Sequence, residues 1–169
     1  GNLIGAMLPS GNTIILQYDV LNRIQSISDD LGLVHRYAYD KNSNNVAVTN
    51  GNGNTVNKQY DQLNRLVKFS DPLGRFTYDA NNNLTSFTDP NNNVTLYGYD
   101  VFNQRITETF PDGSQKGYTY DPYGNVVART EPEGYTVNLV YDAVHRLISR
   151  RYPGNKTEDF AYDANGRIM

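Results

Sequence analysis

Carboxylates are the side chains of this sequence best suited to chemistry, and they recur at a fixed spacing. An aspartate follows a tyrosine eight times, at Tyr18-Asp19, Tyr39-Asp40, Tyr60-Asp61, Tyr78-Asp79, Tyr99-Asp100, Tyr120-Asp121, Tyr141-Asp142 and Tyr162-Asp163. Carboxylates act as general acids or bases, and they bind calcium when several oxygens converge within one loop. Catalytic carboxylates would be expected at one unique place, and the Asn-rich loop of residues 50–54 offers mainly neutral amides. We therefore predict no catalytic residue, and a structural role for all sixteen residues, with each aspartate accepting backbone N–H bonds in a turn.

The rest of the composition excludes several other kinds of site. The 169 residues include no cysteine, which excludes a disulfide framework, a thiolate nucleophile and a Cys-ligated metal. His35 and His145 are the two histidines, too few for a His-rich metal site. We therefore expect no metal and no cofactor. The net charge of −3 argues against binding of nucleic acid, and no apolar run approaches the roughly 20 residues that span a bilayer, so no membrane insertion is expected.

Three recurring patterns leave a binding role open. Arginine recurs near the aspartates, at Arg23, Arg65, Arg105, Arg146 and Arg167. This pattern predicts ion pairs within a turn or between repeats, and the alternative is an anion-binding column. One basic cluster combines His145-Arg146 with Arg150-Arg151. The tyrosines predict packing between repeats, and the alternative is stacking on carbohydrate rings.

The eight Tyr-Asp pairs define a repeat of 21 residues, shortened to 18 between Tyr60 and Tyr78. After each pair a polar turn leads to an aliphatic residue. In two copies the aliphatic residue comes one position later, at Val46 and Ile106, which predicts one additional residue in their turns. A second turn rich in Pro, Gly, Asp and Asn follows within each repeat. Two turns per repeat predict β-hairpins, and the shortened copy predicts a shortened hairpin rather than a lost one.

The segments between the turns have the composition of half-buried strands. The residue two before each repeat tyrosine is apolar or aromatic in seven of eight copies, which places two aromatic columns on one face. Ile24 and Ile27 are three residues apart, and a β-bulge is one explanation for their sharing a face. The prediction is an all-β fold: a repetitive antiparallel hairpin meander of some sixteen strands, with no second layer, whose sheet curls. Residues 1–169 are expected to form one array that begins and ends inside a repeat of a longer protein.

Three copies carry a resemblance to a known family. The segments Tyr18 to Ile24, Tyr60 to Leu66 and Tyr162 to Ile168 resemble the YD repeats of the RHS family, which includes bacterial polymorphic toxins, wall-associated proteins, cocoon-forming components of insecticidal toxin complexes and animal teneurins. The resemblance implies part of a spirally wound, hollow β-sheet shell. Asp71-Pro72-Leu73-Gly74 is superficially similar to part of the family's aspartyl self-cleaving site. Its alignment with the second turns of other repeats predicts a turn instead.

The resemblance implies a non-catalytic structural segment of a shell that encapsulates or displays another domain of the parent, such as a toxin. The expected partners are the remaining repeats and that enclosed domain, and the parent is expected to be secreted or at the cell surface, in bacteria. The alternative is an extracellular carbohydrate-binding or adhesion module, whose aromatic face or turn loops bind a cell-surface glycan. Unpaired edges near residues 3–14 and 160–168 also predict self-association of the chain.

Overall fold

The computed structural model describes residues 2, 4–7, 9, 13–70 and 74–169, and these residues form β-strands joined by short turns. The elements are β1 (Gly5–Met7), β2 (Thr13–Tyr18), β3 (Ile24–Asp29), β4 (Gly32–Tyr39), β5 (Asn45–Asn50), β6 (Thr55–Tyr60), β7 (Leu66–Phe69), β8 (Arg75–Tyr78), β9 (Leu84–Thr88), β10 (Val94–Tyr99), β11 (Arg105–Thr109), β12 (Gln115–Tyr120), β13 (Val126–Thr130), β14 (Thr136–Tyr141), β15 (Leu147–Arg151), the 3-10 turn η1 (Pro153–Asn155) and β16 (Thr157–Asp159). The sixteen strands follow one another in the sheet in chain order. The predicted all-β antiparallel meander is confirmed.

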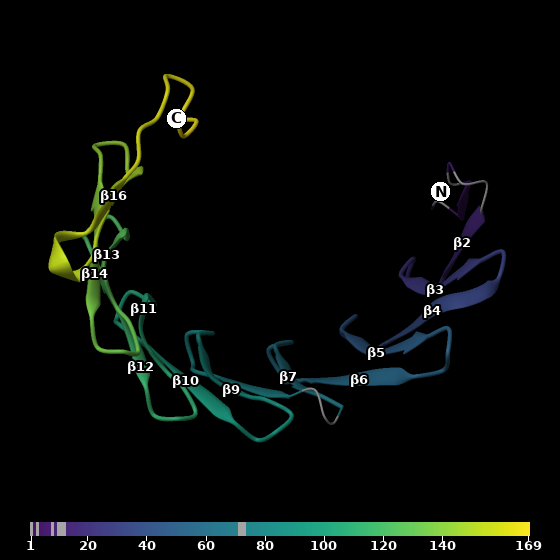
Figure 1. The fold of residues 1–169 in the computed structure, drawn as a ribbon. Helices are drawn as coiled ribbons and strands as arrows, with labels where there is room; N and C mark the ends of the chain where they lie inside the picture. Colours follow the sequence, from purple (N-terminus) through teal and green to yellow (C-terminus); the bar gives the residue numbers. More distant parts are fainter. Residues whose placement is uncertain (1, 3, 8, 10–12, 71–73) are drawn as a thin grey trace. The chain divides into compact units, whose positions relative to one another are not determined.

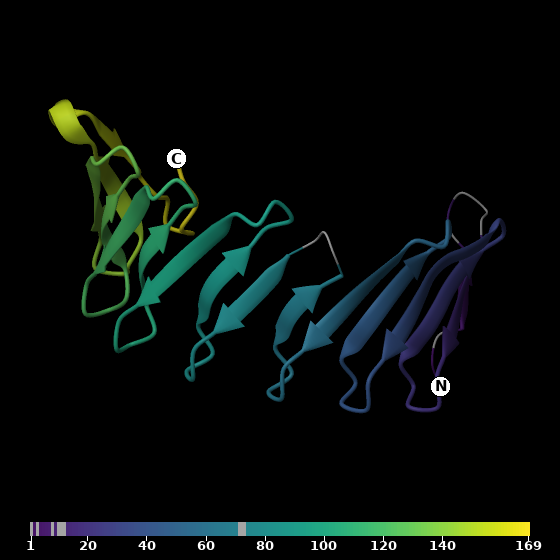
Figure 2. The same ribbon diagram turned by 90° about the horizontal axis from the view of Figure 1, so that it is seen from below.

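Contacts divide the chain into two compact units. The first comprises Gly1–Phe76 with Asp89–Asn91, and the second comprises Thr77–Thr88 with Asn92–Met169. Within each unit the strands lie side by side, and the turns alternate between two edges (Figures 1 and 2). One edge carries the turns that begin with the Tyr-Asp pairs, here called the YD turns.

The shortened repeat keeps a hairpin, as predicted. β7 pairs antiparallel with β8 through Lys68 and Arg75. The amide of Phe69 donates to the carbonyl oxygen of Gly74 at 3.0 Å. The turn predicted over Asp71-Pro72-Leu73 lies outside the described residues.

The YD turns share one backbone geometry. In the first, the Asp19 amide donates to the carbonyl oxygen of Arg23 at 2.9 Å, and the Asn22 amide donates to that of Asp19 at 3.0 Å. Asn22 has a φ of 60°. Left-handed φ values recur at this position in the other turns, at Ser43, Asn64, Asn82, Asn103, Gly124, His145 and Gly166. Seven of these eight positions hold Asn, Ser or Gly, because short polar side chains and glycine tolerate the left-handed region.

The prediction of an additional residue in two YD turns is wrong. In both turns the amide of the repeat aspartate donates to the carbonyl four residues on, as it does after Asp19. The strand register pairs the repeat tyrosine with the sixth residue after it in both copies. Asn45 and Arg105 therefore occupy the position that is aliphatic in most copies, and Val46 and Ile106 are the next residues. The backbone hydrogen bonds set the turn length, whatever side chain follows.

A β-bulge follows the YD turn and explains the irregular outgoing strand. Tyr18 pairs with Ile24 and Gln17 pairs with Ser26, so the intervening Gln25 has no residue opposite it. The same extra residue occurs at Val46, Val67, Ile106, Val127 and Ile148. Because the bulge restores the alternation, Ile27 pairs with Leu16 and shares the face of Tyr18 and Ile24. The bulge predicted as an explanation is confirmed.

The sheet has little buried core of its own. Among the described residues, Val137 is the buried apolar side chain, at 1% exposure. Most strand side chains are half-buried, because a single layer covers them only with their neighbours in the sheet. Contacts between neighbouring strands therefore supply most of the burial.

Candidate functional site

The repeat aspartates organise the YD turns. The Asp142 Oδ1 atom accepts hydrogen bonds from the amides of Val144 at 3.0 Å and Arg146 at 2.9 Å. The Oδ2 atom accepts the Nε–H of Arg146 at 2.7 Å. The bonds from the Arg146 amide and guanidinium hold the pKa of this carboxyl below its ordinary value. Oδ1 accepts the same two amides in the other YD turns, after Asp19, Asp40, Asp61, Asp79, Asp100, Asp121 and Asp163. These are the hydrogen bonds of the predicted turn.

The repeat tyrosines join each repeat to the one before it. The Tyr99 hydroxyl donates to the carbonyl oxygen of Leu84 at 3.0 Å. Equivalent bonds, each to the carbonyl fifteen residues earlier, are made by Tyr39, Tyr60, Tyr120, Tyr141 and Tyr162. Burial raises the pKa of the Tyr99 hydroxyl above its ordinary value. These hydroxyls serve contacts inside the sheet.

A second set of bonds joins neighbouring YD turns and was missed in the sequence. The side-chain amide of Asn83 donates to Asn103 Oδ1 at 2.8 Å. Three equivalent bonds run from Asn44 to Asn64, from Asn125 to His145 and from Arg23 to Ser43. In each case the acceptor is the left-handed residue of the next turn. The signal available in the sequence was the polar pair that recurs at this spacing.

The recurring arginines pair mainly with the aspartate of their own turn. Arg23, Arg65 and Arg146 lie 2.7 Å from that carboxylate. Arg105 instead lies 3.7 Å from Glu108. The basic cluster is likewise engaged, since Arg146 has its aspartate and Arg150 lies 3.3 Å from Glu158. The ion-pair prediction therefore describes these arginines better than an anion-binding column does.

Cations also cover two of the repeat tyrosines. The guanidinium carbon of Arg23 lies 4.4 Å from the ring centroid of Tyr39, and that of Arg146 lies 4.6 Å from the ring of Tyr162. Such contacts stabilise a ring within the sheet. A ring covered in this way presents less of its face to a sugar, which favours packing between repeats for these tyrosines.

The described residues contain no group of three His, Cys, Asp or Glu side chains placed to hold a metal ion. In the Asn-rich loop, Asn50 Oδ1 accepts the amides of Asn52 at 3.1 Å and Asn54 at 3.0 Å, as an aspartate does in the YD turns. In the part of the chain that the structure describes, no helix is long and apolar enough to cross a membrane.

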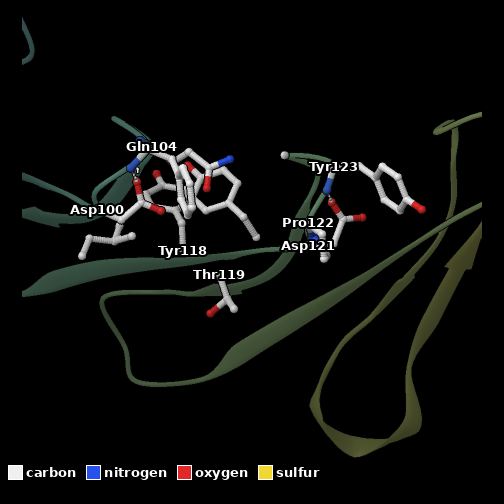
Figure 3. A pocket seen from close by; sticks show the side chains of 11 residues that line it. Asp100, Gln104, Tyr118, Thr119, Asp121, Pro122 and Tyr123 are labelled. Atoms are coloured by element: carbon white, nitrogen blue, oxygen red, sulfur yellow. Dashed lines mark hydrogen bonds between the residues drawn. The ribbon is translucent and has the colours of Figure 1, made fainter.

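Two equivalent grooves lie between YD turns of the second unit. The first, here called the Phe102 groove, has a volume of about 740 Å³ and lies between the turns that begin at Asp100 and Asp121 (Figure 3). The second, here called the Tyr123 groove, has a volume of about 620 Å³ and is lined by the matching positions one repeat later. Phe102 and Tyr123 are both 78% exposed. Each groove therefore has an exposed aromatic side chain in its lining.

Comparison with protein families identifies the repeat. The RHS repeat family matches residues 78–115, 104–136 and 141–169, which is more than half of the chain. The chain belongs to the RHS repeat family, and the resemblance seen in the Tyr-Asp segments is confirmed. No curated protein sequence matches it.

Solved structures show the same fold at low sequence identity. A structure of TcdB2-TccC3 without its hypervariable C-terminal region matches with a TM-score of 0.69 and 16% identity, covering 98% of this chain and 10% of that one. A structure of the Photorhabdus luminescens Tc holotoxin pore with a mutated TccC3 matches with a TM-score of 0.65 and 17% identity, covering 100% of this chain and 12% of that one. This chain therefore spans about a tenth of the length of the chains it matches.

Proposed function

We propose that this chain is a non-catalytic structural segment of an RHS-type shell, which encapsulates or displays another domain of the parent protein. The observation that carries the proposal is the use of the recurring polar groups. The aspartates bind the backbone of their own turns, and the tyrosine hydroxyls bind the carbonyls of the preceding repeat. Side chains whose hydrogen bonds hold the repeats together indicate a structural role rather than a catalytic one.

The proposal extends to the partners and location of the parent. Its partners are the remaining repeats and an enclosed domain, such as a toxin, and the parent is secreted or at the cell surface of a bacterium. Family membership and the fold shared with TcdB2-TccC3 support this assignment. Sequencing the parent gene on both sides of this segment identifies the enclosed domain by its motifs.

Limited proteolysis of the parent protein tests encapsulation. We expect the enclosed domain to resist trypsin in the native parent and to be cleaved when Tyr120→Ala and Tyr141→Ala weaken the wall. Tyr123→Ala is the matched control, because this ring is 78% exposed and its hydroxyl has no partner among the described residues. Equal cleavage of the native parent and the double variant would contradict the proposal.

A carbohydrate-binding or adhesion module is the second candidate. The exposed rings of Phe102 and Tyr123 favour it, because aromatic faces at a protein surface suit the stacking of sugar rings. A glycan-binding screen of the 169-residue chain separates the two functions. Saturable binding that Phe102→Ala and Tyr123→Ala abolish would favour the module, and its absence favours the wall.

A further inference from the structure

The two grooves differ at the left-handed position of the second turn. In the Tyr123 groove this position is His145, and its ring centroid lies 4.9 Å from that of Tyr123 at an interplanar angle of 56°. In the Phe102 groove the same position is Gly124, with a φ of 86° and no side chain. Among the described residues, Phe102 has no ring partner. The side chain that fills one groove is thus absent from the other.

The polar groups of the two grooves differ in the same way. In the Tyr123 groove, the Asn125 amide donates to Asp121 Oδ2 at 2.8 Å and lies 2.9 Å from His145 Nδ1. The equivalents in the Phe102 groove are Asp100 and Gln104. Within the described part of the chain, neither Asp100 Oδ2 nor the Gln104 side-chain amide has a hydrogen-bond partner. The Gln104 amide and the Asp100 carboxylate are therefore available to donate and to accept a hydrogen bond beside the exposed side chain of Phe102.

The free amide is aimed at the missing side chain. A Cβ built on Gly124 would lie 3.4 Å from Gln104 Nε2, an ordinary contact distance. Figure 3 shows Gln104 beside Asp100, with its amide pointing toward the turn that carries Asp121 and Tyr123. A group at the missing position would thus meet the Gln104 amide, as His145 meets Asn125.

We propose that the Phe102 groove is a docking site for a histidine side chain of a partner polypeptide. The imidazole ring packs against Phe102, as the ring of His145 packs against Tyr123. One ring nitrogen accepts from the Gln104 amide, and the N–H of the other donates to Asp100 Oδ2. A saturated side chain offers neither group, and a sugar hydroxyl lacks the planar ring that His145 provides in the equivalent groove. The proposal is independent of the shell, because it depends only on two neighbouring turns.

A titration monitored by NMR tests the proposal on the 169-residue chain. The probe is N-acetyl-histidine methylamide, added to ¹⁵N-labelled protein, and the controls are N-acetyl-leucine methylamide and methyl glucoside. We expect saturable shifts of the Gln104 side-chain amide and the Gly124 backbone amide with the histidine probe alone. No saturable shift, or equal shifts with the leucine or sugar probe, would overturn the proposal.

Two substitutions change the number of open grooves in opposite directions. G124N places at this position the residue most frequent there in the other turns, so it should fill the Phe102 groove and abolish the shifts. H145G should open the Tyr123 groove and add a second set of shifts at the Asn125 side chain. Glycine suits the left-handed backbone there, so the second variant keeps its fold. Persistence of the shifts in G124N, or no new shifts in H145G, would refute the assignment.

Discussion

Replacing Tyr99 separates the contribution of a repeat hydroxyl from that of its ring. Tyr99→Phe removes the hydrogen bond to the Leu84 carbonyl, at 3.0 Å, and leaves the ring in place. A hydrogen bond of this kind contributes about 1 kcal/mol net, so we expect the free energy of unfolding to fall by about that amount. Tyr99→Ala also removes the half-buried ring.

The size of the alanine effect follows from the area that the ring covers. A buried aromatic side chain removes on the order of 150 Å² from water, worth about 4 kcal/mol at roughly 25 cal/mol per Å². A compact unfolded chain already covers part of this area, which lowers the figure to about 3 kcal/mol. Adding the hydroxyl, we expect Tyr99→Ala to cost about 4 kcal/mol.

Urea unfolding followed by circular dichroism measures both effects, and Tyr123→Phe is the matched control. The Tyr123 ring is 78% exposed and its hydroxyl has no partner among the described residues, so the loss should stay within about 0.5 kcal/mol. Equal losses for Tyr99→Phe and Tyr123→Phe would refute the reasoning that the hydroxyl joins repeats. An unchanged unfolding curve for Tyr99→Ala would show that the ring is not part of the packed sheet.

Four other measurements test the remaining features. Asp142→Ala should destabilise the fold more than Asp142→Asn in the same urea assay, because asparagine keeps an Oδ1 acceptor for the turn amides. Since the folded-state pKa of Asp142 is lowered, its stabilising effect is complete above about pH 4 and is lost as the pH falls through the lowered pKa. Since the folded-state pKa of Tyr99 is raised, its stabilising effect is complete below about pH 10 and is lost as the pH rises through the raised pKa. The free energy of unfolding should therefore decline at both extremes of pH. Gly51→Ala should cost about 1–3 kcal/mol, because its Cβ would collide with the Leu33 carbonyl oxygen, whereas Gly53→Asn should cost less, because there is open space around Gly53 and asparagine adopts a positive φ more readily than most side chains do. The outer edges of β1 and β16 lack strand partners among the described residues, so sedimentation equilibrium should show dimers or larger species; a strictly monomeric chain at high concentration would contradict this expectation.

The sequence predicted the hairpins because the features that specify them are local. The Tyr-Asp spacing and the Pro- and Gly-rich second turns define where the chain reverses, and Ile24 with Ile27 already indicated a bulge. The error at Val46 and Ile106 arose from aligning the copies on an aliphatic residue. The left-handed position, occupied by residues such as Asn22 and Ser43, is the better anchor, because the backbone geometry of the turn constrains it.

The Phe102 groove could not be predicted from the sequence, because it depends on residues in two repeats. Gly124 by itself is an ordinary turn residue, and Gln104 by itself is a conservative replacement for asparagine. Their significance appears only when the next repeat shows a histidine bonded to an asparagine at the matching positions. Aligning left-handed residues across copies would have shown that Gly124 and Gly166 leave two turns of an otherwise polar series without a side chain.

Among the described residues, the side-chain bonds between repeats join neighbouring repeats: a tyrosine hydroxyl bonds the carbonyl fifteen residues back, and a turn amide bonds the side chain twenty residues forward. In an array built from such bonds, the free energy of unfolding is approximately the sum of the stabilities of the individual repeats and of the interfaces between adjacent repeats. Melting then starts at the ends and moves inward. A gene encoding this array can gain or lose a whole unit by duplication or deletion, and the units on either side need no compensating change.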